Sequence, residues 1–182
     1  RDDWRHRADL PTRRTLKAQR QQPLPEAPLV SIVVPLYNTP ARWLAEMLGS
    51  VRAQTFPNWQ LCLADASDAA HGAVERTCRA AAGKDPRITY QKLAENAGIA
   101  GNTNAGLALA RGAWIALLDH DDLLYPNALY ELLTLAQRRG ARMAYSDEIV
   151  LSDDLKSLRG YHFKPDYAPD ALNGCNYITH LC

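Results

Sequence analysis

The sequence lacks a long apolar run, although 47% of its 182 residues are hydrophobic. No stretch approaches the roughly 20 continuous apolar residues of a membrane-spanning helix, and no apolar core follows the basic N-terminus as in a signal peptide. Neither sign of charge is in excess, because 21 basic and 20 acidic side chains leave a formal net charge of +1. We therefore expect a cytoplasmic globular protein whose overall charge does not indicate nucleic acid as a partner.

Cysteine is also scarce, and its spacing follows no metal-binding or redox motif. The four cysteines show neither a CxxC pair nor histidines at the spacing of a zinc site. We expect buried free thiols and no disulfide framework. The cysteines are Cys62, Cys78, Cys175 and Cys182.

The N-terminus holds a dense set of arginines and lysines, which is followed by the proline-rich stretch QQPLPEAP. Because proline removes amide donors and keeps its neighbours extended, we expect residues 1–28 to be a basic arm and a linker. The arm is typical of a solvated segment or of a helix that continues an upstream region, and attachment to an acidic surface is the alternative. We expect one folded domain over residues 29–182, truncated at its C-terminus inside the apolar segment NYITHLC.

Strands and helices alternate along this domain. Apolar runs predict strands over residues 29–37, 59–65, 87–93, 113–119 and 142–148. Helical periodicity and stop signals predict helices over 41–54, 73–83 and 127–140, with another inside 95–112. This order indicates right-handed βαβ units and a Rossmann-like α/β fold, with a mainly parallel sheet flanked by helices.

Polar side chains follow most of these predicted strands. In parallel sheets, ligands bind outside the carboxyl ends of the strands. We therefore expect the polar residues to converge on one crevice. They are Asn38, Asp65, Asp119, Asp121 and Asp147.

Three carboxylates follow a single strand in the stretch DHDD, residues 119–122. Their mutual repulsion is costly unless something neutralises it. Oxygen-rich sites of this kind suit Mg²⁺ or Mn²⁺, which is commonly held together with the phosphates of a nucleotide. An ordinary alternative is that Asp122 caps the helix that follows. The residues alone leave both interpretations open.

The order of the segments VSIVVPLYN, LADASD and ENAGIAGNTNAGLALARGAWIALLDHDD resembles the inverting family 2 glycosyltransferases with the GT-A fold. The tail, with MAYSDEIV and GYHFKPDYAPDALNGCNYITHL, is similar to the bacterial branch that builds O-antigen, rhamnan and other cell-surface polysaccharides. The resemblance implies transfer of a sugar from a nucleotide-diphosphate sugar to a glycan or lipid-linked acceptor with inversion, assisted by Mg²⁺ or Mn²⁺. It also implies peripheral association with the inner membrane. The abrupt ends of the chain fit a longer parent chain with further modules.

The resemblance implies a role for several residues on the base and ribose side of the nucleotide. Pro35, Tyr37 and Asn38 match the loop that borders the base and ribose. Asp65 matches the acid that accepts a hydrogen bond from the pyrimidine imide N–H.

On the phosphate side, Asn102 and Asn104 match the helix start that lies over the nucleotide. The D-x-D motif of the family falls on Asp119, His120 and Asp121. The resemblance implies that Asp121 binds the metal directly, with Asp119 nearer the ribose or a metal-bound water.

The chain departs from the family pattern at several positions. Ala66 replaces a second acid after Asp65, which removes one ribose or base contact, and Thr103 replaces an arginine, so that phosphate neutralisation depends more on the metal. Ile149 follows the SDE stretch where some relatives have another acid, which puts a role for Glu148 in doubt.

Four further polar residues allow two interpretations each. Asp147 and Glu148 line the acceptor side of the crevice or merely cap a loop. His162 and Lys164 belong to a surface hairpin with a satisfied histidine, and contact with a phosphate or sugar is the alternative. We expect His180 to be structural.

Inversion requires a general base across the sugar from the metal. We assign this base to no residue and expect it beyond Cys182, which leaves a nucleotide-sugar-binding fragment without activity as the main alternative. A nucleotidyltransferase would need a basic, glycine-rich loop where the chain has PLYNTP. Leu123 and Leu124 argue against a dehalogenase-type phosphatase, which has threonine or valine two residues after the second aspartate.

Overall fold

The structure is a computed structural model that describes residues 10–22 and 24–182. The first nine residues of the predicted basic arm lie outside this part. No helix within the described residues has the length and apolar character needed to cross a bilayer.

The strands are β1 (Val30–Leu36), β2 (Trp59–Asp65), β3 (Ile88–Lys92), β4 (Trp114–Leu117), β5 (Glu148–Leu151) and β6 (Leu158–His162). The helices are α1 (Arg13–Gln21), α2 (Ala41–Arg52), the 3₁₀ turn η2 (Ala69–His71), α3 (Gly72–Lys84), α4 (Gly98–Leu107), α5 (Ala128–Arg139) and α6 (Pro169–Gly174).

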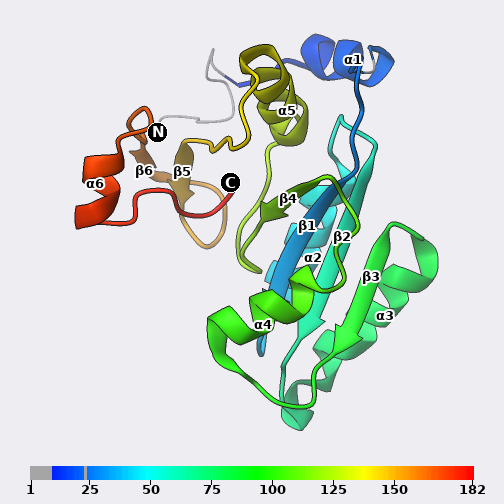
Figure 1. Cartoon of the computed structure of the whole chain (residues 1–182). Helices are drawn as coiled ribbons and strands as arrows, with labels where there is room; N and C mark the ends of the chain where they lie inside the picture. The colour runs from blue at the N-terminus through cyan, green and yellow to red at the C-terminus, as the bar shows by residue number, and fades with distance from the viewer. Residues whose placement is uncertain (1–9, 23) are drawn as a thin grey trace.

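The main sheet has the strand order β3-β2-β1-β4, and all its strands are parallel. Ile32 of the central strand β1 lies opposite Leu61 of β2 and Ala116 of β4. Helix α4 covers one face of this sheet, and α2 and α3 cover the other (Figure 1). The predicted Rossmann-like α/β architecture is therefore confirmed.

Strand β1 is buried on both of its faces. Ile32, Val34 and Leu36 belong to the main hydrophobic core, together with residues of α2 and α3. Val33, which points to the other face, packs against α4 at Gly106, where an added Cβ would lie 2.6 Å from Val33 Cγ1. The continuous apolar run in the sequence is needed because consecutive side chains of a strand point to opposite faces.

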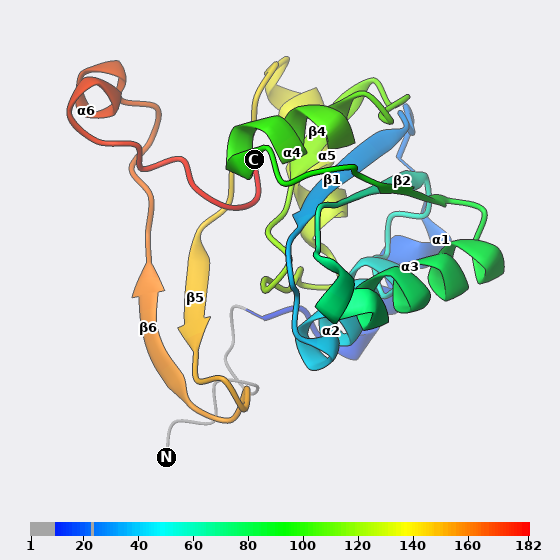
Figure 2. The same cartoon turned by 90° about the horizontal axis from the view of Figure 1, so that it is seen from below.

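The β5–β6 hairpin and α6 form a separate lobe beside the sheet (Figure 2). Strands β5 and β6 pair with each other in antiparallel fashion and do not join the main sheet. The predicted fifth strand over 142–148 is therefore wrong, since residues 142–147 are not in a strand. Met143 is 53% exposed, and Ser146 N donates a hydrogen bond to the C-terminal segment at Leu181 O. The predicted hairpin around His162 is present.

Helix α1 lies within the range expected to be an arm and linker. It packs on the domain through buried Gln19, which donates to Glu131 Oε1 at 2.6 Å and accepts from Thr55 Oγ1 at 2.9 Å. The described part of the arm is thus anchored to α5 and to the loop after α2.

All four cysteines are free. Cys62 and Cys78 are buried, as expected, whereas Cys182 is half-buried and Cys175 is exposed. The expectation of a buried thiol is wrong for Cys175, which follows the short helix α6 in the hairpin lobe.

Candidate functional site

The carboxyl ends of the parallel strands bring several predicted site residues to one edge of the sheet. Leu36 of β1 lies opposite Asp65 of β2, which lies opposite Lys92 of β3. Leu117 is the last residue of β4, so Asp119 follows at the same edge. This is the edge at which parallel α/β sheets bind their ligands.

Asp65 is completely buried at this edge. Its Oδ1 accepts a hydrogen bond from Ser67 N at 2.8 Å, and its Oδ2 accepts one from Tyr90 Oη at 2.8 Å. Lys92 Nζ lies 3.6 Å from Oδ2. Burial and the hydrogen bond to this carboxylate raise the pKa of Tyr90, so that its hydroxyl remains a donor. The expected contact of Asp65 with a pyrimidine stays a prediction.

The loop after β1 is joined to the loop after β2. Asn38 Nδ2 donates to Asp68 Oδ2 at 3.0 Å, and Asp68 N donates to Asn38 Oδ1 at 3.1 Å. Asn38 has a φ of 51°, a conformation that asparagine tolerates better than most residues. Pro35 lies inside β1, opposite Ala64 of β2, and not in the loop that follows the strand. The side chain of Tyr37 is exposed and available to a ligand.

The two asparagines of α4 differ in their surroundings. Asn102 is buried, accepts a hydrogen bond from Ala97 N at 3.1 Å and donates to Asn96 Oδ1 at 2.8 Å. It therefore orders the turn that leads into the helix. Asn104 is exposed, so its side chain is accessible to a ligand.

The acids after β4 meet a histidine from the C-terminal segment. His180 Nδ1 lies 2.7 Å from Asp122 Oδ2 and 3.4 Å from Asp119 Oδ2. Its Nε2 lies 3.4 Å from Glu148 Oε2 at the start of β5. Asp121 is exposed in the same loop and lines a groove that also contains Asp122, Glu148 and His180.

Asp122 does not cap the following helix, because α5 begins after Asn127. Burial raises the pKa of Asp122 above its ordinary value, and the charges of Asp119 and Asp121 raise it further against the effect of His180. The repulsion that the sequence predicts among these acids is therefore present. A bound cation would remove it.

The donor atoms fit a divalent cation. One ligand atom each from Asp119, Asp122 and His180 lie within 4.8 Å of one another. Carboxylate oxygen and imidazole nitrogen are ligands that Mn²⁺ accepts, and carboxylate oxygen suits Mg²⁺. Asp121 precedes Asp122 in the chain but is not part of this group. His120, which lies between Asp119 and Asp121 in the sequence, is half-buried.

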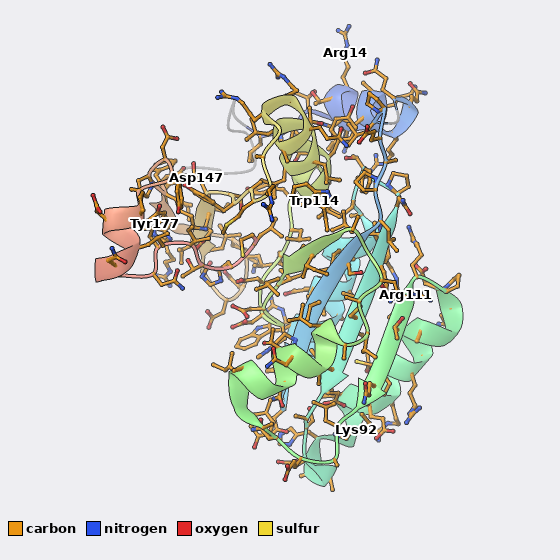
Figure 3. All side chains as sticks on the ribbon, viewed as in Figure 1. Arg14, Lys92, Arg111, Trp114, Asp147 and Tyr177 are labelled. Carbon is orange, nitrogen blue, oxygen red and sulfur yellow. The ribbon has the colours of Figure 1, made fainter. Side chains whose placement is uncertain are left out.

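Three residues differ from their sequence interpretation. Asp147 follows no strand of the main sheet and lies in the hairpin lobe (Figure 3). Its Oδ1 accepts a hydrogen bond from Lys164 N at 2.8 Å. The side chain of Lys164 is fully buried, so the expectation of a surface residue is wrong. His180, expected to be structural, lies against the acids of the site. Sequence spacing gave no signal for this, because some 60 residues separate His180 from them.

A protein-family model described as Glycosyl transferase family 2 matches residues 31–167. The O-antigen biosynthesis protein RfbC of Myxococcus xanthus is 36% identical over 175 residues, which cover 94% of this chain and 13% of that protein. The succinoglycan biosynthesis protein ExoO of Rhizobium meliloti (strain 1021) is 35% identical over 139 residues, which cover 74% of this chain and 37% of that protein. The chain thus spans well under half of either relative.

Two solved structures share the fold. The mannosyltransferase PcManGT from Pyrobaculum calidifontis, in complex with GDP-Man and Mn²⁺, superposes with a TM-score of 0.52 at 23% identity, over 75% of this chain and 41% of that one. Residues 1–349 of S. aureus TarS, in complex with UDP-GlcNAc, also give a TM-score of 0.52, at 21% identity, over 67% of this chain and 33% of that one. The predicted GT-A fold is confirmed, and with the family model matching residues 31–167, the chain belongs to glycosyl transferase family 2.

Proposed function

We propose that this domain binds a nucleotide-diphosphate sugar and transfers its sugar, with inversion, to a glycan or lipid-linked acceptor in the synthesis of a bacterial surface polysaccharide. The observation that carries the proposal is the meeting of Asp119, Asp122 and His180 at the carboxyl edge of the sheet. This edge is where a parallel α/β fold holds its ligand. The names of the relatives RfbC and ExoO support the polysaccharide product.

We assign the base and ribose of the donor to the side of the sheet that carries β1 and β2. Tyr37 is exposed there, and Asn38 is held by Asp68. Pro35 fixes the backbone before them, and Asp65 supplies the acid at the end of β2. Asn102, which orders the turn into α4, and the exposed Asn104 are assigned to the helix that would lie over the nucleotide.

The diphosphate would lie over the loop after β4. Asp119, Asp121, Asp122 and His180 would hold Mg²⁺ or Mn²⁺, which when bound makes the diphosphate a better leaving group by stabilising its developing charge. His120 borders the sugar-phosphate from the same loop. The Mn²⁺ in the complex of PcManGT supports the choice of metal.

The proposal assigns no general base. Asp147 is not assigned this role, because it follows no strand of the main sheet and lies in the hairpin lobe. Until a base is identified, a domain that binds the donor without transferring the sugar remains the second candidate. Such a domain would bind the nucleotide sugar at the same site but would not transfer the sugar to an acceptor.

The setting of the domain is part of the proposal. We place it in the cytoplasm, peripheral to the inner membrane where a lipid-linked acceptor would be found, with residues 29–182 as the glycosyltransferase domain and further modules in a longer protein. The share of RfbC that the chain covers, 13%, supports such additional modules.

Calorimetric titration with UDP, GDP and dTDP, each with and without Mn²⁺, tests the donor site. We expect one diphosphate to bind in a metal-dependent manner, and Asp119→Ala, which removes one carboxylate of the group formed with Asp122 and His180, to weaken that binding about tenfold or more. Asp170→Ala, at an exposed position of α6, is the matched control and should bind like the unchanged chain. Absence of binding by all three diphosphates would overturn the proposal.

A further inference from the structure

Lys164 is a charged side chain with no exposure, in a lobe whose aromatic residues Phe163 and Tyr167 are 68% and 70% exposed. Burying an ammonium group is costly unless each of its donors is satisfied. Lys164 Nζ donates to Ser146 O at 2.7 Å and to Thr179 O at 2.8 Å, and it forms an ion pair with Glu148 Oε1. Its three N–H donors thus have three acceptors.

These acceptors come from two segments that are distant in the chain. Ser146 precedes β5 and Glu148 begins it, whereas Thr179 precedes His180 in the C-terminal segment. Thr179 Oγ1 adds a hydrogen bond to Glu148 Oε1 at 3.3 Å. Lys164 therefore holds the two segments against each other, next to the acids that follow β4.

Glu148 connects this buried charge to the site. Its Oε1 contacts Lys164, while its Oε2 lies 3.4 Å from His180 Nε2 and 3.4 Å from His162 Nδ1. The carboxylate of Glu148 thus faces one nitrogen of the His180 ring, and Asp122 faces the other.

We propose that Lys164 is a positioning residue of the donor site, which holds the His180 imidazole against Asp119 and Asp122 through Glu148. This inference rests on the proposed function, since it gives His180 a role in binding the metal and the diphosphate. It assigns to Lys164 no contact with the substrate. A lysine that only stabilised the hairpin would affect folding and leave the His180 ring in place.

The same hairpin supplies a matched control. Lys156 is 74% exposed and pairs with Asp154, at 3.6 Å, in the turn between β5 and β6. Lys164→Met and Lys156→Met each remove one positive charge while keeping an unbranched side chain. The two variants differ in whether the lost ammonium group contacts Glu148.

The first test is the NMR signal of the His180 ring in histidine-labelled protein, assigned by its loss in His180→Gln. We expect Lys164→Met to shift this signal and Lys156→Met to leave it unchanged, while the amide signals of β1 and β2 show that the sheet is intact. An unchanged His180 signal in Lys164→Met would overturn the inference. If Lys164→Met does not fold, Lys164→Gln decides in the same way, because it keeps hydrogen-bond donors for the buried carbonyls and removes the charge that pairs with Glu148.

The second test is a double-mutant cycle on Mn²⁺ affinity, which a purely structural lysine would not couple to His180. We expect Lys164→Met and His180→Gln each to weaken Mn²⁺ binding about tenfold or more, and the double variant to bind no more weakly than His180→Gln alone. The inference would be overturned if the losses of Mn²⁺ affinity in the two single variants added up in the double variant, or if Lys164→Met bound Mn²⁺ as tightly as the unchanged chain. Failure of the unchanged chain to bind Mn²⁺ or any diphosphate would refute the proposed function instead, and the ring signal would still decide whether Lys164 holds His180.

Discussion

The parallel sheet and the β5–β6 lobe are stabilised in different ways. In the sheet, fully buried aliphatic side chains such as Ile32 and Leu63 fill the space between strands and helices. In the lobe, Val150 and Phe163 are exposed, and the polar contacts of Lys164 and His180 join it to the site. The sheet therefore fixes where the proposed donor site lies, and the lobe and the C-terminal segment bring polar groups to it.

The largest expected difference between the two parts is in packing. Leu63→Ala should lower the free energy of unfolding by about 2–5 kcal/mol, because it leaves a cavity in a completely buried site. Phe163→Ala removes a larger side chain, but one that is 68% exposed and stacks on Tyr161 at the surface of the lobe. It should cost less than about 1 kcal/mol. Urea unfolding followed by circular dichroism measures both, and equal losses would contradict the comparison.

Thiol reactivity should also differ between the main sheet and the β5–β6 lobe. Burial raises the pKa of Cys62 to about 11 and, with the nearby Asp65 charge adding to burial, that of Cys78 to about 12, whereas Cys175 is exposed in the lobe. Since the thiolate is the nucleophile, alkylation at pH 8 should be at least about a hundredfold slower at Cys62 and Cys78 than at Cys175. Iodoacetamide labelling with peptide mass spectrometry gives the three rates. Similar rates would show that the sheet opens readily.

A smaller effect is expected from adding one methyl group at a glycine in each part. An added Cβ at Gly106 would lie 2.6 Å from Val33 Cγ1, whereas at Gly160 of β6 it would meet nothing within 4 Å. Gly106→Ala should therefore destabilise by about 1–3 kcal/mol through overpacking. Gly160→Ala should not lower the melting temperature. Equal decreases in melting temperature for the two variants would contradict the difference in packing between the sheet and the lobe.

The smallest effect is expected from the ion pair that precedes β3. Arg87 donates to both oxygens of Asp85, at 3.0 Å and 2.9 Å, and these hydrogen bonds lower the pKa of Asp85. Because the unfolded chain binds this proton more tightly, the pair stabilises the fold above the unfolded pKa of about 4 and stops doing so as the pH falls through the lower folded value.

We therefore expect Asp85→Asn to lower the free energy of unfolding by about 1 kcal/mol at pH 7 and to leave it unchanged by about pH 2. Asp170→Asn, on exposed α6, is the control and should change neither value. Urea unfolding at the two pH values measures the difference, and a cost that is the same at both would contradict the assignment.

Local patterns in the sequence predicted the sheet well. Continuous apolar runs identified β1 and β2, and helical periodicity identified α2 and α5 to within two residues, because these patterns reflect burial on known faces. The prediction of a fifth strand over RMAYSDE was wrong, because a strand also needs a neighbouring strand to pair with. The pattern of one segment does not identify that neighbour, and the strand that forms, β5, pairs with β6.

The polar part of the site was less predictable. Strand ends correctly placed Asp65 and Asp119 at one edge, but nothing local to His180 or Lys164 indicates that both lie close to the acids after β4. Their positions depend on hydrogen bonds between segments that are far apart in the chain, such as Lys164 Nζ with Ser146 O and Thr179 O. The contact of Tyr90 with Asp65 likewise depends on the register of β2 and β3, which a single sequence does not give.

The most direct test of the account is the broadening of amide NMR signals by substoichiometric Mn²⁺. If the acids after β4 and His180 form one cation site, the signals of residues 119–122 and of His180 should disappear first and together, with those of Asp154 and Asp170 unaffected. Uniform broadening over all exposed acids, or broadening confined to the β5–β6 turn, would contradict the claim that the lobe completes a metal-binding donor site at the edge of the sheet.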